Sequence, residues 1–206
     1  MASQAVIFDI GNVLIRWQPE AYYDRVIGPS RREAFFTETD ILEMHLGIDA
    51  GAPFEETIVA HAKRHPAWHD EIMMWHDDWN ALASPAIDHS VRLLAALKRR
   101  KVPVFTLTNF GAENFPISQD HYEFLKTFDR YYVSGDLKMI KPDANIYAHV
   151  ESDCGLAPEA LLFADDRQEN IDAAAARGWK THHFMDPQGW ADRLIAEGLL
   201  EKDDAT

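Results

Sequence analysis

The stretch Ala5-Val6-Ile7-Phe8-Asp9-Ile10-Gly11-Asn12-Val13-Leu14 places an apolar run directly before a carboxylate and a glycine. A continuous apolar run of this length is typical of a strand buried on both faces of a parallel sheet. Open sheets of this kind bind ligands at the carboxyl ends of their strands. The pattern therefore marks Asp9 as a candidate nucleophile or metal ligand. The alternative is a solvated aspartate at the start of a loop.

The composition is that of a globular, acidic protein. The chain has 206 residues, of which 47% are hydrophobic, and a formal net charge of -14. This length suffices for one domain with a substantial insertion. Nucleic acids and anionic membrane surfaces would repel so acidic a chain, so we expect neither as a partner. No apolar run is long enough to span a bilayer.

The cysteine content and the first residues favour a cytoplasmic location. Cys154 is the single cysteine, so no intramolecular disulfide can form, and we expect a structural thiol there. Residues 1–4 lead into the first strand without a basic and apolar leader. We therefore expect a cytoplasmic protein.

The rest of the chain divides into a helical region and an alternating region. Residues 17–84 show helical periodicity and no strand pattern, as in Leu42, His45 and Leu46 and again in Phe54, Ile58 and Ala62. From Pro85 onward, expected strands near 102–107, 131–133, 161–164 and 181–184 alternate with expected helices near 91–97, 122–125, 144–154, 171–176 and 190–199. This alternation predicts an α/β fold, a Rossmann-like parallel sheet with helices on both faces.

The helical region interrupts the sheet after its first strand. We predict a catalytic core formed by residues 1–16 and 85–206, and a cap formed by residues 17–84. The insertion leaves from the carboxyl end of the first strand and so covers Asp9. Caps of this kind exclude water and select the substrate.

Polar residues follow other strands of the predicted sheet. Thr108-Asn109 follows one strand, Lys141-Pro142-Asp143 follows a later one, and Asp165-Asp166 ends another and precedes Asn170. Each has an ordinary alternative: a helix cap, a surface charge or an N-terminal capping cluster. Together they would meet Asp9 at one edge of the sheet. Three converging carboxylates repel one another unless a cation is present, and hard oxygen ligands suit Mg²⁺.

These motifs, in this order, resemble those of the haloacid dehalogenase-like (HAD) hydrolase superfamily with a small helical cap. The resemblance covers nearly the whole chain and rests on Phe8 to Leu14, Leu107 to Asn109, Lys141 to Asp143 and Phe163 to Asp166. The first motif and the paired aspartates are similar to those of bacterial sugar-phosphate phosphatases of the alpha-D-glucose-1-phosphate phosphatase type. The cap is not distinctive enough to transfer their substrate.

The resemblance implies a Mg²⁺-dependent phosphatase that hydrolyses a small phosphorylated metabolite through an aspartyl-phosphate, with sugar phosphates among the candidates. Asp9 would attack phosphorus, and Thr108 and Lys141 would hold the phosphoryl oxygens. The implied metal ligands are Asp9, the backbone carbonyl of Gly11, and Asp166, with Asp165 in support. Substrate contacts are expected from Asn12, Arg16, Trp17 and Asn109.

Gly11 departs from the superfamily pattern, because most of its phosphatases carry an aspartate there as general acid and base. General acid catalysis contributes on the order of 10²–10⁴-fold. Three explanations stay open: a leaving group that needs no acid, a proton donor in the cap, or slow hydrolysis. The candidate donors are Arg16, His65, His69 and His76.

Two other functions stay open. A 2-haloacid dehalogenase would use Asp9 to displace halide, which needs no proton to leave. Without a cation, however, Asp165-Asp166 would repel the carboxylate of a haloacid. A non-catalytic binding protein would keep the scaffold alone, which is harder to reconcile with the joint presence of Asp9, Thr108 and Lys141.

The cap also holds a patch of histidines and tryptophans, namely His65, Trp68, His69, Trp75, His76 and Trp79. One interpretation is a metal or aromatic-recognition site, and the other is packing within the cap. We favour packing, because Trp75 and Trp79 share a helical spacing and Pro66 interrupts the one between His65 and His69.

Overall fold

The computed structural model describes residues 3–204. Met1 and Ala2, part of the N-terminal segment for which we expect no leader, lie outside the described residues. Five strands form one parallel sheet in the order β5-β4-β1-β6-β7. Their bounds are β1 Ala5–Phe8, β4 Val104–Thr108, β5 Arg130–Val133, β6 Leu161–Asp165 and β7 Lys180–His183. The predicted Rossmann-like fold is confirmed.

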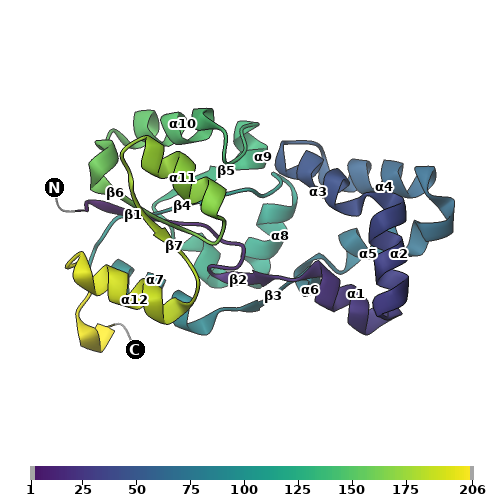
Figure 1. Ribbon diagram of the computed structural model, residues 1–206, viewed down its shortest axis with the longest axis horizontal. Coiled ribbons are helices and arrows are strands. Elements are labelled where there is room, and N and C mark those ends of the chain that lie inside the picture. The colour runs from purple at the N-terminus through teal and green to yellow at the C-terminus, as the bar shows by residue number, and fades with distance from the viewer. Residues whose placement is uncertain (1–2, 205–206) are drawn as a thin grey trace.

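The central strand β1 is buried on both faces, which explains its continuous apolar sequence. Val6 and Phe8 pack into a core with helices α7 (Asp88–Arg99) and α12 (Pro187–Ala196). Ala5 and Ile7 face the opposite side, toward α10 (Ala144–Cys154) and α11 (Gln168–Ala176). Figure 1 shows these two helical layers above and below the sheet. Such double coverage fixes the register, because a slip by one residue would exchange the two faces.

Several short elements of the core show no regular apolar pattern in the sequence. They are α8 (Asn114–His121), α9 (Ser134–Leu137) and the 3₁₀ turns η2 (Glu123–Lys126), η3 (Pro158–Ala160) and η4 (Lys202–Asp204). The helix expected near 122–125 is the turn η2. In α8, Pro116 and several polar residues leave no clear periodicity for a prediction to use.

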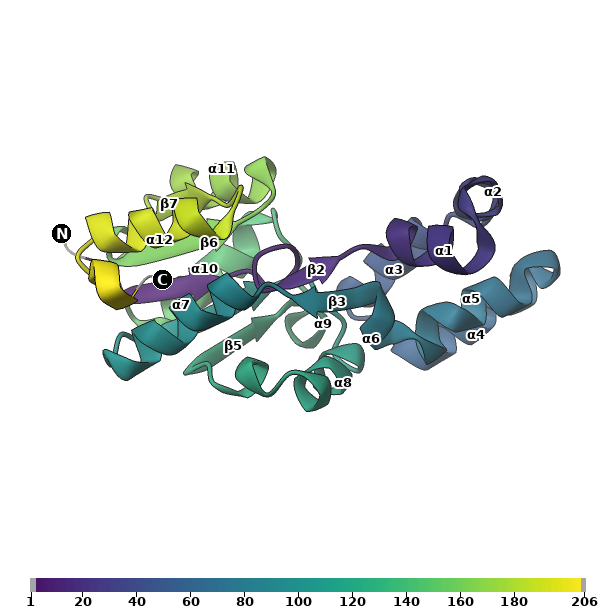
Figure 2. The same cartoon turned by 90° about the horizontal axis from the view of Figure 1, so that it is seen from below.

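Six helices lie together beyond the carboxyl edge of the sheet, as Figure 2 shows. They are α1 Pro19–Ile27, α2 Pro29–Thr39, α3 Ile41–Asp49, α4 Phe54–Arg64, α5 His69–Asp77 and α6 Trp79–Leu82, with the turn η1 at Pro66–Trp68. The division of the chain at residues 17 and 84 stays a prediction. No helix within residues 3–204 combines the length and apolarity needed to cross a membrane.

An antiparallel ribbon connects these helices to the core. Its strands are β2 (Ile15–Trp17) and β3 (Ala83–Ala86). The sequence predicts no strand in residues 17–84, yet the ribbon ends at Trp17 and Ala83 within that range. Strands this short, one of them containing Pro85, are too brief to show alternation.

Helix α3 buries one face and leaves another exposed. Leu42 and Leu46 are 48% and 42% exposed, whereas Ile41, Met44 and Ile48 are buried. The helix predicted from the spacing of Leu42, His45 and Leu46 is therefore present, and Ile41, Met44 and Ile48 form its buried apolar face. In α4 the expected face is buried.

Candidate active site

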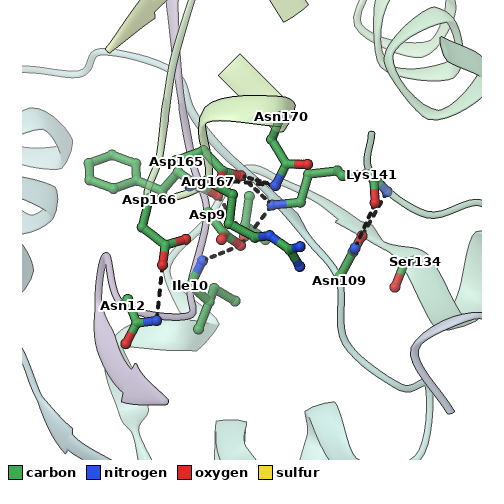
Figure 3. A network of polar contacts seen from close by, with 12 residues as sticks. Asp9, Ile10, Asn12, Asn109, Ser134, Lys141, Asp165, Asp166, Arg167 and Asn170 are labelled. Carbon is green, nitrogen blue, oxygen red and sulfur yellow. Dashed lines mark hydrogen bonds and ion pairs between the residues drawn. The ribbon is translucent and has the colours of Figure 1, made fainter. Parts of the chain in front are cut away.

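Three carboxylates meet at the carboxyl end of the sheet. Asp9 follows β1, Asp165 is the last residue of β6, and Asp166 comes next. Each offers an oxygen that lies within 4.8 Å of the oxygens of the other two, and they form the one group of this kind in residues 3–204. Figure 3 shows their side chains converging from neighbouring strands. This donor set could hold a cation.

Lys141 lies between two of these carboxylates. Its Nζ is 2.6 Å from Oδ2 of Asp165 and 3.0 Å from Oδ1 of Asp9. Lys141 is 3% exposed and Asp165 is fully buried. Although burial opposes it, the charges of Asp165 and Asp9 raise the pKa of Lys141 above its usual range. The buried ammonium is therefore held in its charged form, next to the candidate nucleophile.

Both carboxylate oxygens of Asp165 accept hydrogen bonds from more than one donor. Nδ2 of Asn170 donates to both of its oxygens, at 2.9 and 3.0 Å, and the backbone N–H of Arg167 donates to Oδ1 at 2.8 Å. Lys141 donates to Oδ2. A carboxylate with this many donors is fixed in place, so Asp165 orients Lys141 firmly.

The environment of Asp9 disfavours its ionised form. The backbone N–H of Ile10 donates to Oδ1 of Asp9 at 2.7 Å. Burial raises the pKa of Asp9 to about 7, Lys141 opposes this rise, and Asp165 and Asp166 add to it. Burial also raises the pKa of Asp166. A cation among these carboxylates would favour their ionised forms.

Two asparagines support the charged residues. Nδ2 of Asn12 donates to Oδ2 of Asp166 at 2.9 Å. Both ends of the Asn109 amide bond the backbone of Lys141, at 2.9 and 2.8 Å. Both amides therefore hold other site residues in this structure. The expectation that Asn12 and Asn109 contact the substrate stays a prediction.

A cavity of about 490 Å³ opens above the carboxylates. Core residues form its floor, among them Asp9, Gly11, Asn109, Lys141, Asp166 and Asn170. Its other walls carry mainly apolar and aromatic side chains, including Ile15, Trp17, Leu42, Leu46, Trp79 and Phe110. A reactive polar floor under apolar walls is the usual character of a small-molecule site.

Of the other predicted site residues, some line the cavity and others do not. Arg16 and Trp17 line the cavity, with Arg16 exposed and Trp17 half-buried. Thr108 ends β4 and is 1% exposed, but it is not one of the described residues that line the cavity. His65, which stacks on His61, does not line it either. The same is true of His69 and His76.

Two polar residues of α3 that the sequence analysis did not name as site residues line the cavity. They are His45 and Asp49, one helical turn apart. Burial lowers the pKa of His45 to about 4. Burial, together with the charge of Asp9, raises the pKa of Asp49 to about 7. The i, i+4 spacing of a histidine and an aspartate was the available signal, but the sequence does not show which face of α3 turns toward the core.

The tryptophans of the cap pack together beside this cavity. Trp17 stacks on His45 at 4.9 Å between ring centroids, and it contacts Trp75 and Trp79 at 5.8 and 5.4 Å. Trp75 is fully buried, as the packing interpretation predicts. Trp79 differs, because it also packs on Phe110 of the core and lines the cavity. The histidines of the patch form no metal-binding group among residues 3–204.

Comparison with known proteins adds to this geometry. The family model for haloacid dehalogenase-like hydrolases matches residues 4–178. The sesquiterpene phosphatase of Aspergillus oryzae is 28% identical over 194 residues, which cover 89% of this chain and 90% of that protein.

Solved structures share the fold at lower identity. A HAD family enzyme from Bacteroides thetaiotaomicron, solved in complex with magnesium and inorganic phosphate, is 22% identical with a TM-score of 0.66, and the match covers 87% of this chain and 93% of that one. The L-2-haloacid dehalogenase of Xanthobacter autotrophicus is 17% identical with a TM-score of 0.64, covering 98% and 86%. At these identities the likeness concerns the fold alone.

Proposed function

Because this chain belongs to the haloacid dehalogenase-like hydrolases, we propose that it is a phosphatase that uses Asp9 as its nucleophile. The observation that carries the proposal is the buried ammonium of Lys141, 3.0 Å from Asp9, beside a group of three carboxylates. This arrangement suits a doubly charged phosphoryl group better than a neutral carbon centre, because the ammonium and a bound cation together offset its charge.

We propose Mg²⁺ as the cation of this site. The donors are all carboxylate or carbonyl oxygens, which suit Mg²⁺, and three acidic groups surround only one buried ammonium. Asp9, Asp166 and the carbonyl of Gly11 would hold the ion, and Asp165 would support them through Lys141. Bound Mg²⁺ supplies charge neutralisation to the phosphoryl oxygens. The magnesium and phosphate complex of the Bacteroides thetaiotaomicron enzyme supports this choice.

In the proposed reaction, the free oxygen of Asp9 attacks phosphorus, and the bond from phosphorus to the leaving oxygen breaks. The N–H of Ile10 and the ammonium of Lys141 fix the orientation of the Asp9 carboxylate. Lys141 also binds a phosphoryl oxygen, and the hydroxyl of Thr108, at the end of β4, binds another. Water then hydrolyses the aspartyl-phosphate and restores Asp9.

The cavity walls favour a substrate whose organic part is apolar. Trp17, Trp79 and Phe110 present ring faces, and Leu42 and Leu46 lie exposed where they line the cavity. Polar wall residues, among them Arg16, Glu43 and Arg167, are fewer than the apolar ones. A phosphorylated small molecule with an apolar body therefore fits these walls, and the name of the Aspergillus oryzae relative, a sesquiterpene phosphatase, agrees with that class.

One assay separates the proposed function from its alternatives. The protein is incubated with Mg²⁺ and an aryl phosphate, then with a chelator, and separately with a 2-haloacid. We expect release of phosphate that the chelator abolishes. Halide release that is indifferent to the chelator would instead indicate a dehalogenase, and no turnover on either compound would indicate a binding protein.

A further inference from the structure

Asp49 is a buried carboxyl group of the cap that faces the reaction site. It is the last residue of α3, it is 8% exposed, and it lines the cavity together with Asp9 and Lys141. Its Oδ1 is buried and has no hydrogen-bond partner within residues 3–204. An unpaired buried carboxyl oxygen costs stability, so such a group beside a reaction site calls for a functional explanation.

The core fixes the backbone of Asp49. Oγ of Ser134, the first residue of α9, donates to the carbonyl of Asp49 at 2.6 Å. The same Oγ accepts a hydrogen bond from the backbone N–H of Phe110 at 2.9 Å. Phe110 itself lines the cavity. This contact therefore sets where the Asp49 side chain lies relative to the catalytic floor.

Burial and the charge of Asp9 favour a neutral acid at Asp49, and His45 does little to oppose them. Nε1 of Trp75 donates to Nδ1 of His45 at 3.4 Å, so the neutral ring carries its proton on Nε2. That Nε2 is 3.7 Å from Oδ1 of Asp49, too far for a hydrogen bond. Because burial keeps the pKa of His45 low, the ring offers Asp49 no positive charge at neutral pH. The raised pKa of Asp49 agrees with a carboxyl group that still holds its proton there.

We propose that Asp49 is the proton donor to the leaving group, the role that Gly11 cannot fill. The inference rests on the proposed phosphatase function. As Asp9 forms its bond to phosphorus, the leaving oxygen takes its electron pair from phosphorus and the proton from Asp49. The Asp49 carboxylate then takes a proton from the water that attacks the aspartyl-phosphate, so Asp49 regains its starting form and no other proton carrier is needed.

The test compares two substrates whose leaving groups differ in their need for a proton. The rate constant kcat/KM is measured with Mg²⁺ on an aryl phosphate and on a primary alkyl phosphate, for the wild type, Asp49→Asn and Asp136→Asn. We expect Asp49→Asn to lose about 10²–10⁴-fold on the alkyl phosphate and much less on the aryl phosphate. Asp136, an exposed carboxylate on α9, is the matched control, and its substitution should change neither rate.

The wild type alone provides a second measurement that needs no variant to fold. With an acid in place, its rate should depend only weakly on leaving-group pKa. A steep dependence in the wild type, or equal losses of Asp49→Asn on both substrates, would overturn the assignment. Absence of Mg²⁺-dependent hydrolysis by the wild type is a different result, which would overturn the proposed function itself and this inference with it.

A second substitution, at Gly11, tests the role of Asp49 by returning a carboxyl group to the site. A Cβ built at Gly11 meets only the Cβ of Trp17, at 4.0 Å, so a side chain can begin there without a clash at its first atom. In an Asp49→Asn background, Gly11→Asp should recover at least about tenfold on the alkyl phosphate, because it returns a carboxyl acid to the site. A packing defect at Asp49 would not be repaired in this way. A double variant with intact Mg²⁺ binding and no recovery would count against the proposal.

Discussion

Asn12 and Asp166 lie 154 positions apart in the chain and are joined by a hydrogen bond of 2.9 Å from Nδ2 to Oδ2. Asn12 has a left-handed backbone, with φ at 53°, a conformation that asparagine adopts more readily than most residues. Its Oδ1 accepts from the backbone N–H of Trp17 at 3.1 Å. One side chain thus connects a proposed metal ligand to the strand that leads toward the cap.

Removal of this amide should weaken metal binding. Glycine tolerates a positive φ, so Asn12→Gly deletes the hydrogen bond without straining the backbone. We expect Mg²⁺ affinity to fall by about 10–100-fold, as is typical when a group that orients a metal ligand is lost. Titration calorimetry measures this directly. An unchanged affinity would show that Asp166 needs no orientation by Asn12.

The two adjacent aspartates should respond differently to substitution. Asp165→Ala leaves the buried ammonium of Lys141 with one carboxylate fewer, and we expect a stability loss of about 3 kcal/mol or more. Asp166→Ala should cost less stability and more Mg²⁺ affinity, because Asp166 is the less buried of the two. Urea unfolding and calorimetry on both variants separate these effects. Equal behaviour of the two variants would contradict the division of roles.

Asp9→Asn should abolish hydrolysis and leave the fold intact. The amide keeps the shape of the side chain, including an oxygen that can accept from Ile10, but it is no longer a nucleophile. We expect a loss of at least about a thousandfold in kcat. The unfolding temperature should not fall, because burial and the other two carboxylates disfavour the charge of Asp9 more than its contact with Lys141 favours it. Activity near that of the wild type would eliminate Asp9 as the nucleophile.

Protonation of His45 should make stability depend on pH. The pKa of this histidine is about 4 in the folded protein and 6.5 in the unfolded chain. Between these values the unfolded state binds a proton that the folded state does not, so stability falls as pH drops from 6.5 toward 4. The full shift corresponds to about 3 kcal/mol.

His45→Phe removes this contribution and keeps an aromatic ring next to Trp17. Compared with the wild type, the variant should gain relative stability as pH is lowered from 7 to 5. Urea unfolding at several pH values gives the two curves. Parallel curves would show that the ring is protonated in the folded state or that burial does not perturb it. The raised pKa of Asp49 acts in the opposite sense in both proteins, so only the difference between them is diagnostic.

The floor of the site could be predicted because strand ends in a parallel sheet have only one place to meet. Once Ala5 to Phe8 is taken as a buried strand, the residues after each later strand must lie near Asp9. The order of the motifs then predicted that Lys141 and Asp166 would be close to Asp9, as the structure shows.

The cap could not be predicted to the same depth. Its helices bury apolar residues both against each other and toward the core, so a periodic pattern does not tell which face is which. In α3, Leu42, His45, Leu46 and Asp49 all line the cavity, but the sequence did not show that His45 and Asp49 would turn toward it. Of the candidate proton donors, Arg16 lines the cavity and His65, His69 and His76 do not, and their role in catalysis stays a prediction.

The ribbon of β2 and β3 has a mechanical consequence for the cavity. Both passages of the chain between the sheet and the six helices run through this ribbon, where Trp17 pairs with Ala83. If the six helices move relative to the sheet, the chain bends at this ribbon, which then acts as a pivot. Points close to a pivot travel little, so the walls formed by Trp17 and Ala83 keep their distance from Asp9. Asp49 at the end of α3 is also held to the core through Ser134, so the cavity wall on that side has a second fixed point.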